Sequence, residues 1–175
     1  MNMLYTKSPM SLAGSFELKE ASIHDAAEIY GKDIIINKAL ELVQLDLKRS
    51  KVMFTSPSDG YRKLMELELC NRDRERFLVI YLDQQHRFLS SKVLFEGTID
   101  AAAVYPRVVV AEALKLNSAA LLLCHNHPSG KVSPSQADRK ITRRISEALA
   151  LMDIRLLDHY IVGDEFYSFA EHGIL

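Results

Sequence analysis

The chain has 175 residues, enough for one compact domain with a substantial core plus an extension. Its 48% hydrophobic and 26% charged residues are ordinary globular composition, and a net charge of −1 gives no overall attraction to nucleic acid. Two cysteines are too few for a disulfide framework, no apolar run reaches membrane-spanning length, and the N-terminus lacks a signal-peptide pattern. We therefore expect a soluble cytoplasmic protein.

The first part of the chain, up to about residue 32, carries weak patterning. From Asp33 onward, apolar residues recur at helical spacing and predict one amphipathic helix. The turn-rich stretch 56–60 follows and marks the start of the main domain. We therefore expect an N-terminal extension over 1–52 and a main domain over 53–175.

The main domain alternates helical and strand patterns in the order helix, hairpin, helix, strand, helix, hairpin. This order predicts an α/β/α-type sandwich around a mixed sheet. The expected elements are a helix at 58–70, strands at 77–82 and 87–95, a helix at 106–116, a strand at 119–125, a helix at 135–152, and strands at 154–162 and 166–169.

Two histidines stand at the end of the apolar strand that closes near residue 125. His125 and His127 share one side of that strand, because side chains alternate. Gly130 turns the chain, and Ser135 opens an amphipathic helix with Asp138 in its first turn. Two imidazoles and a carboxylate can meet there, which is the ligand set of a catalytic zinc site with one open position.

Simpler interpretations exist for each of these residues. Ser135 and Asp138 have the S-x-x-D spacing of a helix-capping box. A histidine at a strand end is usually a surface or hydrogen-bonded residue, and two histidines with a carboxylate also suit non-haem iron. The combination of H-x-H, turn residues, a helix start and Asp is harder to explain without a metal.

The spacing of this motif resembles a known family. H-x-H, seven residues, Ser, two residues and Asp, as found from His125 to Asp138, resembles the JAMM motif of MPN (JAB) domains. Over about residues 53–175 the sequence looks like the RadC branch of this family, which was named for DNA repair. The residues that carry this resemblance are 95–98, 106–107, 125–130, 158–159 and 168–171. The resemblance implies an α/β fold, an MPN (JAB)-like mixed β-sheet sandwiched by helices, with a cytidine-deaminase-like architecture.

The resemblance also implies a chemistry. His125, His127 and Asp138 would bind Zn²⁺ with water in the fourth position, as in a zinc-dependent metallopeptidase or isopeptidase acting on a peptide or protein. Two alternatives stay open: a DNA repair, recombination or antirestriction accessory protein with a structural metal, and a metal-dependent nuclease. The first 50 residues lack the helix-hairpin-helix module of longer RadC proteins, so the chain is more similar to short RadC-like proteins of prophages and mobile elements. We therefore expect weak or no direct nucleic-acid binding.

Further roles follow from the same resemblance. Glu75, just before the first long strand, occupies the place of the family's general base, and Glu96 at the end of the returning strand is the rival candidate. Ser135 would donate a hydrogen bond to the oxyanion of the substrate. Asp158 and His159 interrupt an apolar strand, either as support for the metal ligands or as a satisfied structural pair.

Four cations follow the motif on the helix that begins near residue 135: Arg139, Lys140, Arg143 and Arg144. Such a row is usually a solvated helix face, and it could also steer an acidic peptide or DNA toward the site.

Overall fold

The computed structural model describes residues 31–51, 53–54, 59–69, 73–97 and 104–175. The chain divides into two units, Met1–Ile35 and Ile36–Leu175. Nearly all of the weakly patterned stretch at the start of the chain lies outside the described residues. The second unit contains the sheet and the core.

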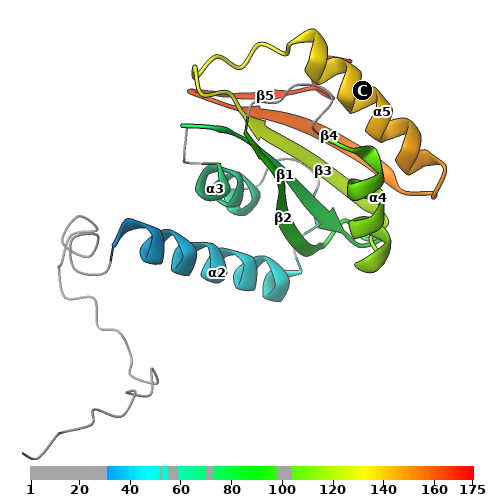
Figure 1. Ribbon diagram of the computed structural model, residues 1–175. Coiled ribbons are helices and arrows are strands. Elements are labelled where there is room, and N and C mark those ends of the chain that lie inside the picture. Colours follow the sequence, from blue (N-terminus) through cyan, green and yellow to red (C-terminus); the bar gives the residue numbers. More distant parts are fainter. Residues whose placement is uncertain (1–30, 52, 55–58, 70–72, 98–103) are drawn as a thin grey trace, which may run out of the picture. The chain divides into compact units, whose positions relative to one another are not determined.

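A five-stranded mixed sheet forms the centre of the second unit, in the order β2-β1-β3-β4-β5 (Figure 1). Its strands are β1 (Glu75–Leu82), β2 (Phe88–Gly97), β3 (Ala120–Asn126), β4 (Arg155–Val162) and β5 (Phe166–Ser168). β1 pairs antiparallel with β2 and β3, β3 pairs parallel with β4, and β4 pairs antiparallel with β5. The single parallel pair needs a crossover, and a helix between β3 and β4 supplies it.

Helices cover both faces of this sheet (Figure 1). They are α2 (Lys32–Ser50), α3 (Asp59–Glu68), α4 (Pro106–Lys115) and α5 (Gln136–Ala150). Pro106 starts α4 at a position where its missing N–H costs nothing. The side chains of α3 pack in one core cluster and those of α4 and α5 in another, so the sheet lies between two helical layers.

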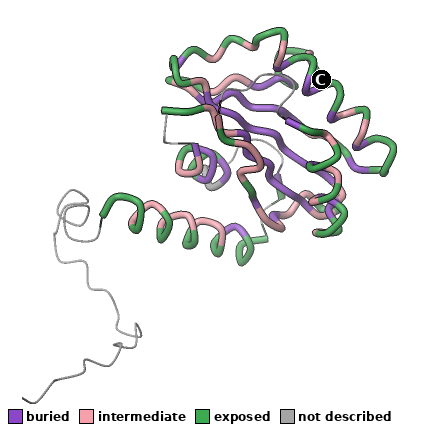
Figure 2. The backbone as a smooth tube through the Cα atoms, in the orientation of Figure 1, coloured by how far each residue is buried: buried purple, intermediate pink, exposed green. Residues whose placement is uncertain are grey.

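Strand alternation sorts the side chains of the central strands between the two clusters. Leu122 and Cys124 of β3 face the layer with α3, whereas Leu121 and Leu123 face α4 and α5. All seven residues of β3 are buried, which explains its continuous apolar run (Figure 2). Cys124 packs away from the histidine face, and burial raises the pKa of its thiol well above the ordinary value.

The helix α2 contributes to the same core through its apolar spacing. Leu40, Val43 and Leu47 pack in the cluster that contains α3. Gln44 donates a hydrogen bond to the hydroxyl of Ser91 in β2, at 3.1 Å. The greater part of α2 therefore packs within the second unit.

The predicted α/β class and the order of elements are confirmed, with a sheet flanked by helices as in an MPN (JAB)-like fold. Strand and helix ends differ from the expected ones by a few residues, as hydrophobic periodicity does not locate the last hydrogen bond of an element. Within the described part of the chain, no helix is both long and apolar enough to span a membrane.

The hairpin between β1 and β2 is stabilised by Asp83. Its carboxylate accepts hydrogen bonds from the backbone N–H groups of Gln85 and Arg87, at 2.8 and 2.9 Å. His86 follows in the left-handed conformation, with φ of 58°. A local carboxylate thus replaces the glycine that a tight turn often needs.

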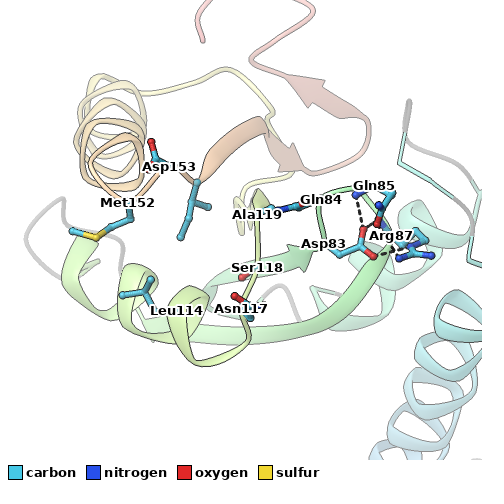
Figure 3. A pocket seen from close by; sticks show the side chains of 11 residues that line it. Asp83, Gln84, Gln85, Arg87, Leu114, Asn117, Ser118, Ala119, Met152 and Asp153 are labelled. Carbon is cyan, nitrogen blue, oxygen red and sulfur yellow. Dashed lines mark hydrogen bonds and ion pairs between the residues drawn. The ribbon is translucent and has the colours of Figure 1, made fainter.

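A pocket of about 430 Å³ lies beside this hairpin (Figure 3). Asp83 and Arg87 line one side, and Leu114, Met152 and Asp153 line the other. Residues that precede β3 lie between these two groups, so the pocket is at the opposite end of β3 from His125. This pocket is therefore separate from the polar cluster predicted to carry the chemistry.

Candidate metal centre

The two histidines come from the end of the central strand β3. His125 is the penultimate residue of β3 and is almost fully buried, while His127 follows the strand and is partly exposed. The ring of Phe77 from β1 stacks on that of His125, with 6.3 Å between centroids. His125 is thereby held by the rigid centre of the sheet.

Asp138 brings a carboxylate to the same point from the first turn of α5. Its Oδ1 lies 3.3 Å from Nε2 of His125, and its Oδ2 lies 3.5 Å from Nε2 of His127. The two Nε2 atoms are 3.0 Å apart. Among the described residues, these three form a group whose ligand atoms lie within 4.8 Å of one another.

These separations fit a metal ion. With zinc–ligand bonds of about 2.0–2.2 Å in a tetrahedral arrangement, neighbouring ligand atoms stand roughly 3.4 Å apart. The observed spacings of 3.0–3.5 Å bracket this value. The group could therefore bind a metal ion without rearrangement of the backbone.

Atoms with free electron pairs converge at this point. Nδ1 of His127 lies 2.7 Å from the carbonyl oxygen of Lys131, which can only accept, so Nδ1 carries the proton. Nε2 of the neutral ring then presents a lone pair toward the Asp138 carboxylate. Lone pairs and a negative charge at one point repel unless a cation, either a proton or a metal ion, lies between them.

The pKa values describe the case in which a proton fills this place, with the imidazoles donating to the carboxylate. Burial alone would raise the pKa of Asp138, but hydrogen bonds with His125 and His127 outweigh it and hold the pKa well below its usual range. The same hydrogen bond to Asp138 raises the pKa of His127, against the effect of burial. Asp138 is thus ionised at neutral pH, as a metal ligand must be.

Ser135 and Asp138 also form the capping box that the spacing predicts. The hydroxyl oxygen of Ser135 accepts from Asp138 N–H at 3.1 Å, and Asp138 Oδ2 accepts from Ser135 N–H at 2.7 Å. The cap uses only a lone pair of the Ser135 hydroxyl, so its proton remains available to another acceptor. Capping and a role at the site are compatible.

Two glycines let the β4–β5 turn contact the loop after His127. Gly163 lies so close to Gly130 that a Cβ on it would come within 2.2 Å of the Gly130 carbonyl oxygen. Gly130 has φ of 76°, and Asp164 N–H donates to its carbonyl at 3.1 Å. The loop between the two histidines and α5 is therefore held by backbone contact that only glycine allows at these positions.

Glu75 is the first residue of β1 and lies on the same face of the sheet as the histidines. Phe77 pairs with His125, and Glu75 precedes Phe77 by one strand period. The Glu75 carboxylate also raises the pKa of His127, after the larger effects of Asp138 and of the Lys131 hydrogen bond. Glu75 also lines a pocket of about 300 Å³ together with Arg74 and Pro128.

Asn126 holds the backbone on either side of Glu75. Its side-chain NH₂ donates to the Arg74 carbonyl at 3.0 Å, and its side-chain oxygen accepts from Arg76 N–H at 2.8 Å. The side-chain amide continues the hydrogen bonding between β1 and β3 past the end of the strand. The position of Glu75 is thereby defined by two hydrogen bonds to its neighbours.

Glu96 points to the opposite face of the sheet. It pairs with Arg76, and its carboxylate forms an ion pair with Arg76 Nε at 3.6 Å. Because Arg76 and Glu75 are adjacent in β1, their side chains leave opposite faces. Glu96 therefore does not share the histidine face.

Of the two roles considered for Asp158 and His159, Asp158 has the structural one and His159 contacts a proposed metal ligand. The Asp158 carboxylate accepts from its neighbour His159 N–H, from Ala170 N–H and from the Ser168 hydroxyl, which ties β4 to the C-terminal turn. His159 faces the other way, with its Nε2 2.9 Å from Nδ1 of His125. Burial keeps the pKa of His159 well below its ordinary value.

Two polar residues of the site carry no motif signal of their own. Asn126 lies between the histidines, and only the pairing of β1 with β3 shows what it binds. Thr142 is a buried polar residue on the apolar face of α5, where it contacts His159. A hydroxyl among Ile141, Ile145 and Leu149 is the signal that could have identified Thr142.

A sequence model of the RadC-like JAB domain matches residues 54–174. The chain belongs to the RadC-like JAB domain family. It is 63% identical over 120 residues to a UPF0758 protein of Vibrio vulnificus (strain YJ016) and 59% identical over 120 residues to one of Aliivibrio salmonicida (strain LFI1238); each match covers 68% of this chain and 53% of the relative. A UPF0758 protein of Vibrio parahaemolyticus is 52% identical over 147 residues, or 81% of this chain and 65% of the relative.

The chain thus spans about half to two thirds of the length of these curated RadC-like relatives. The matched region contains Glu75, the two histidines, Ser135 and Asp138. The family membership covers the JAB domain, which contains the cluster of His125, His127 and Asp138.

Proposed function

We propose that this chain is a zinc-dependent hydrolase of the JAMM type that cleaves an amide bond in a peptide or protein. The observation that supports this proposal best is the convergence of His125, His127 and Asp138, with 3.0–3.5 Å between their ligand atoms. Three protein ligands leave one tetrahedral position for water or substrate, which distinguishes catalytic from structural zinc sites.

A bound zinc ion would supply a Lewis acid that makes a water molecule reactive at neutral pH. Glu75, from the same face of the sheet, accepts a proton from that water as its oxygen adds to the carbonyl carbon. The same carboxyl then delivers the proton to the amide nitrogen as the C–N bond breaks. Atoms and charge balance, because one water is consumed and one acid and one amine are released.

Ser135 stabilises the charge that develops on the substrate oxygen. Its hydroxyl oxygen already accepts from Asp138 N–H, which orients the group at the start of α5. The hydroxyl proton is free to be donated to the oxyanion. The positive end of the α5 helix adds to this stabilisation.

The proposal predicts metal-dependent release of amines from protein substrates. A bacterial protein extract is incubated with the purified chain, and new amino groups are labelled and located by mass spectrometry. New α-amines indicate peptide cleavage, whereas new lysine ε-amines indicate isopeptide cleavage. The signal is expected to disappear after treatment with a zinc chelator and to return with added zinc; cleavage that persists in the chelated protein contradicts the proposal.

A DNA-associated role is the second candidate, and one observation favours it. Arg139, Lys140, Arg143 and Arg144 are all exposed on α5, whose first turn carries Asp138. With a net charge of −1 for the chain, we expect weak binding that falls steeply with salt. Titration against duplex and single-stranded DNA at near-physiological salt measures this, and tight binding there would favour the accessory-protein role.

A further inference from the structure

A continuous chain of hydrogen-bonding groups lies behind His125, away from the metal side of its ring. Nδ1 of His125 is 2.9 Å from Nε2 of His159, and Nδ1 of His159 is 2.6 Å from the Thr142 hydroxyl oxygen. That hydroxyl lies 2.5 Å from the backbone carbonyl oxygen of Asp138. His125, His159 and Thr142 are 1%, 0% and 3% exposed, so water does not compete with these contacts.

The donor and acceptor capacities of these groups fix the direction of each hydrogen bond in the row. The Asp138 carbonyl can only accept, so it takes the single hydroxyl proton of Thr142. Thr142 must then accept from Nδ1–H of His159. With its proton on Nδ1, the buried His159 ring offers a lone pair on Nε2, so His125 donates to it through its own Nδ1–H.

We propose that Thr142 and His159 are positioning residues that fix the ring tautomer of His125, with the proton on Nδ1 and the lone pair of Nε2 facing Asp138 and His127. The role of this tautomer in metal binding depends on the proposed function. The direction of the hydrogen bonds does not depend on the proposed function, because it follows from Thr142, His159 and the Asp138 carbonyl alone.

The opposite direction of these hydrogen bonds shows what Thr142 and His159 prevent. If Thr142 donated to His159, then Nε2–H of His159 would donate to His125, and His125 would carry its proton on Nε2. That proton would point at Asp138 Oδ1, 3.3 Å away, and occupy the space of the metal ion. His127 is fixed differently, by the backbone carbonyl of Lys131, so only His125 depends on side chains for its tautomer.

Thr142→Val tests the proposal, because it removes one hydroxyl and leaves both histidines in place. The ring nitrogens of His125 are assigned by ¹⁵N NMR in the full chain without metal, at a pH where the rings are neutral. The unaltered chain is expected to show His125 protonated on Nδ1, and Thr142→Val to show a mixture with the Nε2 form. Thr142→Ser restores the hydroxyl and is expected to restore the Nδ1 form.

Zinc affinity provides a second measurement, by competition with a chromophoric chelator. Loss of an outer hydrogen-bond partner typically costs about 10–100-fold in metal affinity, so Thr142→Val should bind zinc more weakly by that order and Thr142→Ser nearly as well as the unaltered chain. A purely structural hydroxyl would instead lower the thermal stability of Thr142→Val and leave the His125 tautomer unchanged.

The outcomes separate this inference from the proposed hydrolase. His125 protonated on Nε2 in the unaltered chain overturns the inference, even if Thr142→Val fails to fold. An unchanged tautomer and zinc affinity in a folded Thr142→Val variant overturns it as well. If the tautomer behaves as expected but no amide bond is ever cleaved, the positioning role stands and the hydrolase proposal fails.

Discussion

Glu75→Gln is expected to abolish most amide hydrolysis while leaving zinc content and fold unchanged. Glutamine has nearly the same shape, but it cannot accept a proton at neutral pH. Because general acid–base catalysis is typically worth about 10²–10⁴-fold, the rate should fall by at least that order. Glu75 lies outside the ligand group of His125, His127 and Asp138, so metal binding should remain. Rates are measured on a substrate found in the amine-labelling experiment, with zinc determined by elemental analysis.

Glu96→Gln is the matched control for this experiment. Glu96 ends the neighbouring strand but pairs with Arg76 on the opposite face of the sheet. Its loss should change the rate little. A rate that falls in Glu96→Gln and not in Glu75→Gln would show that Glu96 of β2, and not Glu75 of β1, carries the proton. If neither substitution changes the rate, the JAMM mechanism is contradicted for this chain.

His127→Ala is expected to reduce zinc from about one ion per chain to a small fraction of that, because two remaining ligands cannot complete a tetrahedral site. The loss of affinity should exceed the roughly 10–100-fold typical of an outer hydrogen-bond partner. His127 is the best ligand to remove, since it is partly exposed and follows β3. Elemental analysis of protein purified without added metal provides the measurement, and circular dichroism checks that the fold is retained.

Asp138→Ala would be harder to interpret, because Asp138 also caps α5 through Ser135. Loss of a cap costs about 0.5–2 kcal/mol of stability, which would accompany any loss of metal. The matched control is His172→Ala. His172 is exposed and hydrogen-bonds the Ser168 carbonyl, so its replacement should leave zinc unchanged. Full zinc occupancy in His127→Ala would contradict the assignment of the site.

The three proposed ligands could be predicted from the sequence because they are close together in it. A strand end, a turn and a helix start bring His125, His127 and Asp138 into one region with little help from the rest of the fold. The helices and strands were predictable for a similar reason, since each buries a face that repeats with its own period.

The surroundings of the site could not be predicted in this way. Asn126 reaches Arg74 and Arg76 only because β1 pairs with β3, and His159 reaches His125 only because β4 lies parallel to β3. These contacts join residues far apart in sequence, and their register cannot be read from periodicity. The choice between Glu75 and Glu96 also depends on strand pairing, because the pairing of β1 with β2 shows which face of the sheet each side chain occupies.

The strand order also bears on self-association at high concentration. Open strand edges can pair with another molecule and begin aggregation. Here the edge at β5 is three residues long, and the register between β1 and the other edge strand, β2, shifts between Phe77 and Leu78 and again between Tyr81 and Leu82. The exposed Lys92 adds a charge to β2. Short, irregular and charged edges oppose edge-to-edge stacking, and the apolar β3 stays enclosed in the middle of the sheet.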